Sequence, residues 1–180
     1  MATGDKKRVL MEADKGASGG VMTQHYNASV EATSDVTIHD RGWYRVLSVN
    51  HHGDANVALV TISHNFNTND TFAVVASVSM AAFHPWINVL GVSAGLDCTK
   101  LRLVKDANNH MHLDVYYYSN VRNVFQASAL CHGGLNSFTM SDFTPVEETV
   151  EGETVVLEKT LVSLNTLESL RDALKAIWDA

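Results

Sequence analysis

Residues 72–80 have the sequence Phe-Ala-Val-Val-Ala-Ser-Val-Ser-Met, and this stretch decides the fold class of the 180-residue chain. Phe72, Val74, Ala76, Val78 and Met80, which are all apolar, stand at every second position and alternate with a set that includes Ser77 and Ser79. A period of two is typical of a half-buried β-strand, because successive side chains on a strand point to opposite faces. The stretch therefore predicts a strand with one face in a core.

Strand-like segments continue on both sides of this stretch. Residues 57–64 are apolar and rich in β-branched side chains, and residues 101–105 and 111–118 flank the turn sequence Asp-Ala-Asn-Asn at residues 106–109. A further strand is expected at residues 121–127. Short strands at intervals of roughly 8–12 residues, with no helical period between them, are typical of sandwiches and barrels. We predict an all-β chain that forms an antiparallel, jelly-roll-like β-sandwich.

Three segments are expected along the chain. Residues 1–35 have little periodicity and include the run Lys-Gly-Ala-Ser-Gly-Gly at residues 15–20, so they predict an extended N-terminal arm. Residues 36–150 carry the strand pattern and predict the sandwich domain. Residues 151–180 predict a connector and a short C-terminal helix. The acidic stretch at residues 147–153 indicates a solvated connector.

The C-terminal residues change from a strand period to a helical one. Leu167, Leu170, Leu174 and Ile177 are spaced by 3, 4 and 3 residues, and Trp178 lies beside this row. A helix of about fourteen residues is only marginally stable alone in water, so it must pack against something. It either docks on its own sandwich or packs against copies of itself in an oligomer, and the sequence leaves both alternatives open.

The charge balance excludes several classes of partner. The chain carries 13 Lys and Arg against 20 Asp and Glu, and its formal net charge is −7. Nucleic acid and anionic lipid are therefore not expected partners. No apolar run approaches the ~18–20 residues of a membrane span, and the polar residues after Met1 are not typical of a signal peptide. We expect synthesis in the cytoplasm. We also expect Cys98 and Cys131 to be reduced, partly buried thiols.

Two histidines and a carboxylate, His110, His112 and Asp114, stand at alternate positions and share one face of the predicted strand. A divalent transition metal accepts ligands of these types. Alternate residues lie roughly 7 Å apart along a near-straight strand, however, so a single ion would need a bend in the chain or a ligand from a partner. We expect a solvated or groove-lining polar face and no metal site, with metal binding as the alternative.

Aromatic side chains provide a candidate receptor or glycan site. Trp86 follows His84 and Pro85 in a predicted loop, and Tyr116 and Tyr118 share a strand face with the two histidines. Aromatic rings offer large apolar faces with a polar edge, and the C–H face of a pyranose packs well on such a ring. The alternatives are a core position for Trp86 and a subunit interface for the tyrosines.

Catalytic signatures are absent from the sequence. It contains no G-x-S-x-G, H-E-x-x-H, Walker or G-x-G-x-x-G motif. Cys131 and His132 are neighbours, but adjacent side chains on a strand face away from each other. We therefore expect no enzymatic activity and no cofactor.

An ordered set of short motifs resembles the β-sandwich domains of bacteriophage fibre and appendage proteins. The motifs follow one another along the chain at Gly42-Trp43-Tyr44-Arg45-Val46, residues 72–79, residues 101–104, residues 113–117 and residues 138–145. The segment Met-Glu-Ala-Asp-Lys-Gly at residues 11–16 resembles the lead-in segments of such proteins. The resemblance covers roughly residues 36–150. It implies a homotrimeric virion component whose sandwich head touches the host surface, with no metal or catalytic set.

The expected function follows from this resemblance and from the short length of the chain, which leaves no room for a fibre shaft. We expect a non-enzymatic head fibre or tail fibre, made in the host cytoplasm and located in the virion, with adhesion to a host-surface glycan. The arm would anchor the chain to another virion protein through Lys6, Lys7, Arg8, Val9, Leu10 and Met11. A stand-alone carbohydrate-binding module is the alternative, and a small metal-dependent enzyme built on the His110 strand is a third.

Overall fold

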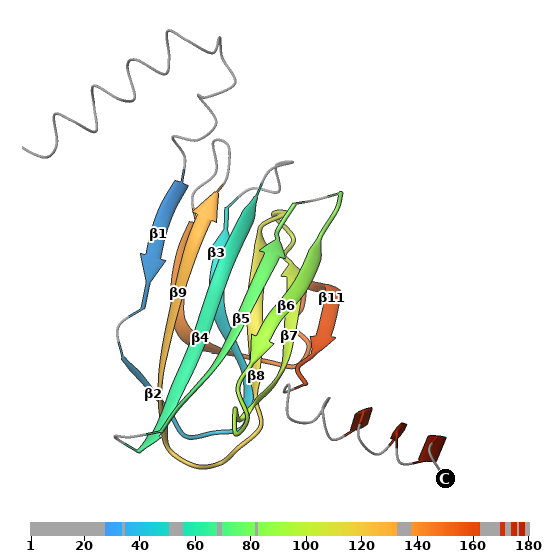
Figure 1. The fold of residues 1–180 in the computed structure, drawn as a ribbon. Coiled ribbons are helices and arrows are strands. Elements are labelled where there is room, and N and C mark those ends of the chain that lie inside the picture. Colours follow the sequence, from blue (N-terminus) through green and yellow to red (C-terminus); the bar gives the residue numbers. More distant parts are fainter. Residues whose placement is uncertain are drawn as a thin grey trace, which may run out of the picture.

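The computed structural model is a sandwich of two antiparallel β-sheets (Figure 1). It describes residues 28–33, 35–50, 56–67, 70–81, 83–132, 138–162, 170–171, 174–175 and 177–178. The predicted all-β, antiparallel sandwich is confirmed by this architecture. Within the described residues, no helix is both long enough and apolar enough to cross a membrane.

The two sheets have six and five strands, and every pairing between strands is antiparallel. Sheet A consists, in spatial order, of β1 (Ala28–Ala32), β9 (Asn123–His132), β4 (Val57–Asn67), β5 (Asp70–Ser79) and β6 (Trp86–Val92), and β2 (Val36–Ile38) also pairs with β9. Sheet B consists of β10 (Phe138–Val146), β3 (Gly42–Val49), β8 (Met111–Tyr117), β7 (Cys98–Lys105) and β11 (Thr154–Thr160).

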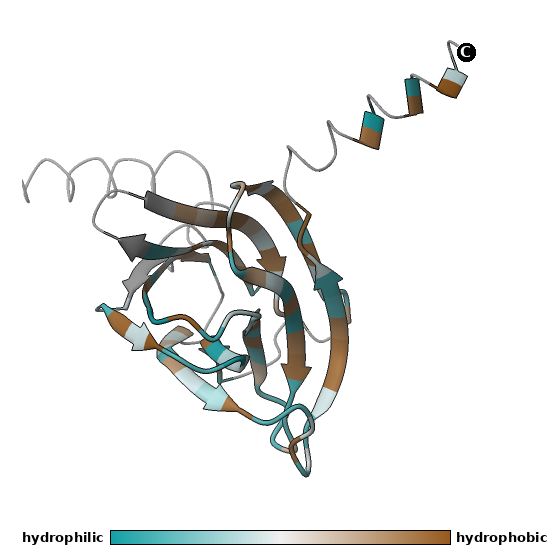
Figure 2. Ribbon diagram, turned by 90° about the horizontal axis from the view of Figure 1, so that it is seen from below, coloured by the Kyte–Doolittle hydropathy of each residue, from teal (hydrophilic) through white to brown (hydrophobic). Residues whose placement is uncertain are grey.

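The hydrophobic core fills the space between the sheets, which curve around a common interior (Figure 2). Phe125 of β9 lies in the middle of it, and its ring contacts those of Tyr117 and Phe143 at centroid distances of 5.2 and 5.3 Å. Each large apolar side chain buried in this way stabilises the fold by about 1.5–3 kcal/mol. Cys98 and Cys131 are not joined in a disulfide, which agrees with the predicted reduced thiols, but both are buried rather than partly buried.

A bulge in the edge strand β10 turns Phe143 into this core. Met140 pairs with Leu47 and Thr144 pairs with Arg45, so two extra residues of β10 stand opposite β3. Asp142 and Phe143 lie in this bulge and have left-handed backbone conformations, with φ angles of 42° and 51°. Left-handed backbone is uncommon for side-chain-bearing residues and costs free energy. Burial of the Phe143 ring, which is 2% exposed, offsets that cost.

The sandwich is longer at both ends than residues 36–150. Strand β1 lies inside the predicted arm, where it pairs with β9 from Ala28 to Ala32. Strand β11 lies inside the predicted connector, where Thr154–Thr160 pairs with β7. The expected boundaries are therefore corrected, because these two edge strands belong to the sheets.

The pairing register defines two ends of the sandwich. A row of partners runs across sheet A from Ala28 through His132, Val57 and Ser79 to Trp86, and we call this the β1 end. At the opposite end, the β8 end, Tyr117 pairs with Gly42 and Cys98 in sheet B. The backbone N–H of Asp97 donates to Nε2 of His64 at 2.9 Å and joins sheet B to sheet A there.

The chain enters and leaves the sandwich at opposite ends. Residues 1–27 precede the first residue of β1, at the β1 end. The last residue of β11, Thr160, pairs with Lys100, and the N–H of Leu161 donates to the carbonyl of Thr99 at 2.8 Å. These contacts lie at the β8 end, from which the C-terminal helical segment projects (Figure 1).

Candidate functional site

A cleft at the β8 end is the candidate site, because aromatic and charged side chains line it together. It has a volume of about 400 Å³ and lies between the first residues of β3, the last residues of β8 and β10, and the segment that follows β10. It is lined by Asp40, Arg41, Gly42, Trp43, Tyr44, Tyr116, Pro145, Val146, Glu147 and Glu148. Aromatic, guanidinium and carboxylate groups therefore meet in one hollow.

Trp43 forms the inner wall of this cleft. The guanidinium carbon of Arg102 lies 4.2 Å from the centroid of the indole ring, and the ring of Tyr116 meets the indole edge-on at 5.2 Å. The indole N–H donates to Oε2 of Glu148 at 2.9 Å. Because Trp43 is only 2% exposed, it holds the other groups in place, and Tyr116 presents the aromatic surface.

A buried charge network lies beneath the cleft, on the outer face of sheet B. Asp114, which is fully buried, accepts hydrogen bonds from Nε of Arg45 at 3.0 Å and from Nε of Arg102 at 3.1 Å. Arg45 also makes a two-pronged pair with Glu153 at 3.0 and 2.9 Å. Burial alone would lower the pKa of Arg45, but Glu153 and Asp114 outweigh it and raise the pKa. Buried charges persist only when they are paired in this way.

This network corrects the sequence-based interpretation of the strand at residues 110–114. We expected a solvated or groove-lining polar face, but His112 is 8% exposed and Asp114 is fully buried. The long side chains of Arg45 and Arg102, from the strands on either side of β8, cover that face. His110 alone keeps substantial exposure, with 38% of its side chain open to solvent.

The acidic segment after β10 is exposed at Glu147, Glu148 and Glu151, in line with the expected solvated stretch, and its backbone is also tied to sheet B. Arg102 donates from its two terminal nitrogens to the carbonyls of Glu148 and Glu147 at 2.8 and 3.0 Å. Glu153 is held by Arg45. The backbone of Glu147 and Glu148 is therefore held beside the cleft by a buried arginine.

The rim of the cleft is also ordered by local contacts. The guanidinium of Arg41 stacks on Tyr118 at 4.6 Å from the ring centroid, and its Nε donates to the carbonyl of Tyr118 at 2.7 Å. The hydroxyl of Tyr44 donates to the carbonyl of Asp40 at 2.6 Å. Tyr118 remains 54% exposed. An exposed aromatic ring is thus held next to the cleft by a cation.

The groups in and beside the cleft are of the types that contact a hydroxylated ring such as a sugar. Its acidic side chains accept hydrogen bonds from hydroxyl groups, Arg41 donates them, and Tyr116 and Tyr118 offer apolar surface. The site predicted from the sequence includes the two tyrosines but not Arg41, Trp43 or Glu148. The Gly-Trp-Tyr-Arg motif contains Trp43, so the motif itself could have indicated one wall of the site.

The other two members of the expected glycan set lie at the opposite end of the sandwich. Trp86 pairs with Ser79 at the β1 end, whereas Phe72, at the other end of β5, pairs with His64 near the β8 end. Ser79 and Phe72 are seven residues apart along β5, which corresponds to about 23 Å. His84 and Trp86 therefore do not join Tyr116 and Tyr118 in one site. Trp86 is 39% exposed, so it is not a core residue either.

A smaller polar cluster surrounds His112. Its Nδ1 shares a hydrogen bond of 2.9 Å with Ser48, and its Nε2 lies 3.6 Å from Oδ2 of Asp106, which also contacts His110 at 3.1 Å. Burial and the nearby Arg45 lower the pKa of His112. Among the residues that the structure describes, no group of three His, Cys, Asp or Glu side chains is arranged to hold a metal ion.

The C-terminal helical residues do not pack on the sandwich. Leu170, Leu174, Ile177 and Trp178 are between 55% and 88% exposed. The segment that carries them projects away from the two sheets (Figure 2). Of the two alternatives for this helix, docking on its own sandwich does not occur at these residues. Leu167 and the expected anchoring residues Lys6, Lys7, Arg8, Val9, Leu10 and Met11 lie outside the described residues.

Comparison of the chain with protein-family models, with curated proteins and with solved structures gave no match. The resemblance to bacteriophage fibre domains therefore rests on the sequence motifs and remains a prediction.

Proposed function

We propose that the chain is a non-enzymatic structural protein of a bacteriophage virion, a homotrimeric head or tail fibre that displays its sandwich for adhesion to the host surface. The observation that carries this proposal is that the N-terminal segment and the cleft lie at opposite ends of the sandwich. The N-terminal segment joins the sandwich at Ala28, at the β1 end, and the cleft with Tyr116 and Tyr118 lies at the β8 end. A chain anchored by its arm would hold the cleft outward.

The exposed row of the C-terminal helix supports an oligomer. Leu170, Leu174 and Ile177 are spaced by 4 and 3 residues, and all three are more than half exposed. Apolar side chains at this spacing pack as the seam of a coiled coil. The helix in this proposal clamps three copies together, and the other virion protein binds the arm.

The experiment that tests the oligomer is light scattering on a sizing column, with the full chain beside a chain that ends at residue 161. The proposal predicts a trimer for the full chain. Loss of the trimer on truncation assigns the clamp to the helix, and a trimer in both keeps the fibre but places the contact on the sandwich. A monomer in both contradicts the fibre.

A stand-alone carbohydrate-binding module is the second candidate, because the cleft is complete within one copy of the chain. The two functions differ in their prediction for mass. A module binds glycan as a monomer or dimer, and it needs no partner for the arm.

A further inference from the structure

We propose that the outer face of sheet A is the surface through which copies of this chain pack against one another. This inference rests on the proposed oligomer and adds to it the face that the copies share. It starts from the unequal distribution of charge between the two sheets.

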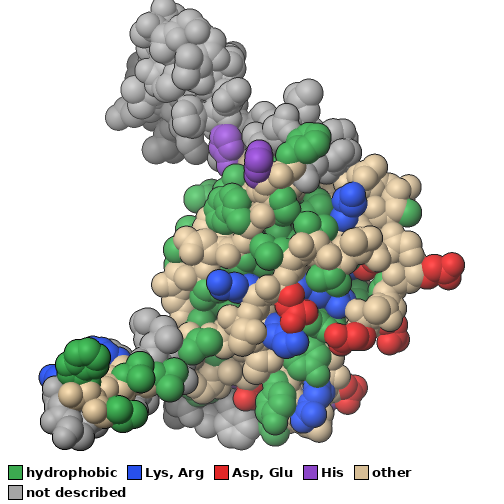
Figure 3. Space-filling view, turned by 90° about the vertical axis from the view of Figure 1, so that its right-hand side faces the viewer, with side chains coloured by type: hydrophobic (Ala, Val, Ile, Leu, Met, Phe, Trp, Pro, Cys, Tyr) green, Lys and Arg blue, Asp and Glu red, His purple; other side chains and the backbone are tan. Residues whose placement is uncertain are grey.

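Charged residues are concentrated in sheet B. Each of its five strands carries at least one Asp, Glu, Lys or Arg, whereas in sheet A β2, β4, β6 and β9 carry none, β5 carries only Asp70 at its first position, and β1 carries only Glu31. Figure 3 shows acidic and basic side chains gathered on the side of the molecule that carries β11. The chain has a net charge of −7, so an uncharged face is the place where two copies can approach with the least repulsion.

Two leucines stand next to each other on the uncharged face. Leu59 of β4 and Leu130 of β9 are direct register partners, and they are 42% and 51% exposed. On the next strand, Ser77 is the partner of Leu59, and it is followed by Asn88 of β6. The leucines therefore form a raised apolar pair among small and uncharged side chains.

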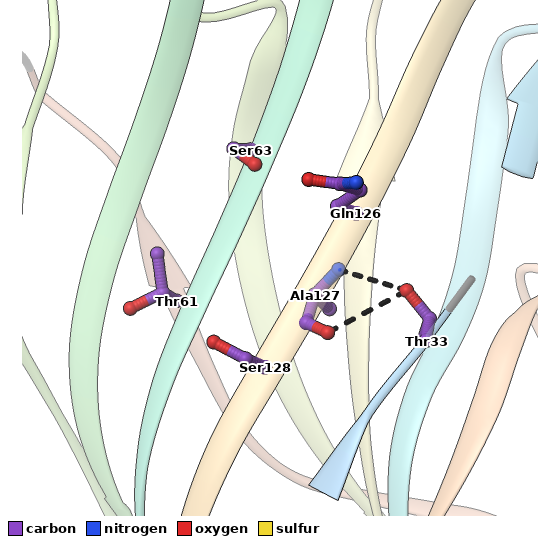
Figure 4. Close-up of a pocket in the computed structure, with 6 residues that line it drawn as sticks. All are labelled: Thr33, Thr61, Ser63, Gln126, Ala127 and Ser128. Carbon is purple, nitrogen blue, oxygen red and sulfur yellow. Dashed lines mark hydrogen bonds between the residues drawn. The ribbon is translucent and has the colours of Figure 1, made fainter. Parts of the chain in front are cut away.

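A hollow lies immediately beside this pair (Figure 4). It has a volume of about 220 Å³ and is lined by the side chains of Thr33, Thr61, Ser63, Gln126 and Ser128 and by Ala127. On one side of it, the hydroxyl of Thr33 accepts the N–H of Ala127 at 2.9 Å, and the backbone N–H of Thr33 donates to the carbonyl of Ala127 at 2.9 Å. Asp35, which accepts a hydrogen bond from Gln126, is the carboxylate at its rim.

A second copy of the chain is the occupant that these features favour. A partner with charged side chains would bury them against this face without counterions, which is costly, whereas the same face of another copy brings few charges, with Asp35 at the rim of the hollow. In a trimer, the raised leucine pair of one copy can meet the hollow of the next copy around a three-fold axis. Four strands spaced by ~4.8 Å, each about eight residues long at ~3.3 Å per residue, cover roughly 500 Å² in projection. Stable interfaces bury about 600–1,000 Å² of accessible surface per partner. The accessible area of the face is larger than its projected area, because side chains protrude from it, and so it approaches that range.

The test introduces a charge on the face in the full chain and measures mass by light scattering. Leu130→Glu places a carboxylate at the centre of the proposed contact, and Ser128→Lys places an ammonium group beside the hollow at another exposed position. Val155→Glu is the matched control, because Val155 is 46% exposed on β11 of sheet B. Circular dichroism establishes that each variant keeps its sheet content.

The proposal predicts that both sheet A variants lose the mass of the oligomer, with at least a tenfold rise in the concentration needed to assemble, while Val155→Glu assembles like the unmodified chain. If the unmodified chain and both sheet A variants are trimers of equal stability, the face is not the contact, and the proposed trimer stands without it. If Val155→Glu dissociates as readily as Leu130→Glu, the contact is not specific to sheet A and the inference is wrong. A monomeric unmodified chain overturns both the inference and the proposed trimer.

Discussion

Arg102 lies over the ring of Trp43, with its guanidinium carbon 4.2 Å from the centroid of the indole. This contact links the buried charge network of sheet B to the candidate cleft. The guanidinium of Arg102 donates to two backbone carbonyls of the segment after β10, and the indole N–H of Trp43 donates to the carboxylate of Glu148. The charge of Arg102 is in turn balanced by Asp114.

We expect Asp114→Asn to destabilise the fold strongly. The change leaves Arg102, which is 2% exposed, without its buried counterion, and breaking a buried pair in this way costs about 3–5 kcal/mol. The measurement is urea unfolding followed by tryptophan fluorescence. Glu158→Gln is the control, because the pair of Glu158 with Lys100 is exposed and contributes far less. Equal effects of the two changes would show that the network does not carry the stability assigned to it.

The stability of the fold should fall as the pH decreases below about 6.5. Burial lowers the pKa of His64 despite the nearby Asp97, and the Nε2 atom of His64 accepts a hydrogen bond that only the neutral ring can accept. Burial and Arg45 lower the pKa of His112, against the opposing effects of Glu153, Asp106 and Asp114.

In the unfolded chain both histidines take up protons near their ordinary pKa of 6.5, whereas in the folded chain they do so only at lower pH. The stability due to the two neutral rings is therefore fully present above 6.5 and is lost as the pH falls toward the folded pKa values. Urea unfolding at several pH values between about 8 and 5 measures this slope. A His64→Gln, His112→Gln double variant should have a flatter slope. His84→Gln is the control, because His84 is exposed, and its slope of stability against pH should equal that of the unmodified chain. An unchanged slope in the double variant would mean that other groups cause the pH dependence.

Glycan binding, if it occurs at the cleft, depends on Tyr118 and not on Trp86. An aromatic contact is worth about 0.5–1.5 kcal/mol, so Tyr118→Ala should weaken binding by up to roughly tenfold. Trp86→Ala is the matched control, because it removes an aromatic ring of comparable exposure at the other end of the sandwich. Binding is measured on an array of bacterial surface polysaccharides. Loss of binding in the Trp86 variant alone would move the adhesive surface to the β1 end.

Gly95→Ala should destabilise the fold more than Gly152→Ala. Both glycines have positive φ angles, 83° and 82°, which cost a side-chain-bearing residue about 1–2 kcal/mol. A Cβ at Gly95 would also lie 2.6 Å from the ring of Phe72, whereas the nearest atom to a Cβ at Gly152 is 3.7 Å away. The clash adds about 1–3 kcal/mol. Thermal unfolding compares the two variants, and equal melting temperatures would mean that the ring of Phe72 can move aside.

The sequence predicts the strands whose burial alternates, and it fails where contacts between distant strands decide the outcome. Along β9 the exposure alternates residue by residue, so a period of two is sufficient to find it. Along β8 almost every residue is buried, because arginines from β3 and β7 cover the outer face. The order of strands in the sheet, which the sequence does not display, decides which charges meet at Asp114.

The candidate site was predictable in the same limited sense. Tyr116 lies in β8 and Tyr118 directly follows the last residue of that strand, so their common location follows from local spacing. The separation of Trp86 from them depends on the register of β5 with its neighbours, which local patterns do not determine. The edge strand β11 could have been found, since Val155, Val156 and Leu157 form an apolar, partly β-branched run within the segment interpreted as a connector.

The mass of the full chain in solution tests the central claim of a fibre most directly. Sedimentation equilibrium over a range of micromolar concentrations should give three times the chain mass of 19.7 kDa. A mass of 19.7 kDa at every concentration would contradict the homotrimeric fibre and leave the carbohydrate-binding module as the function to test.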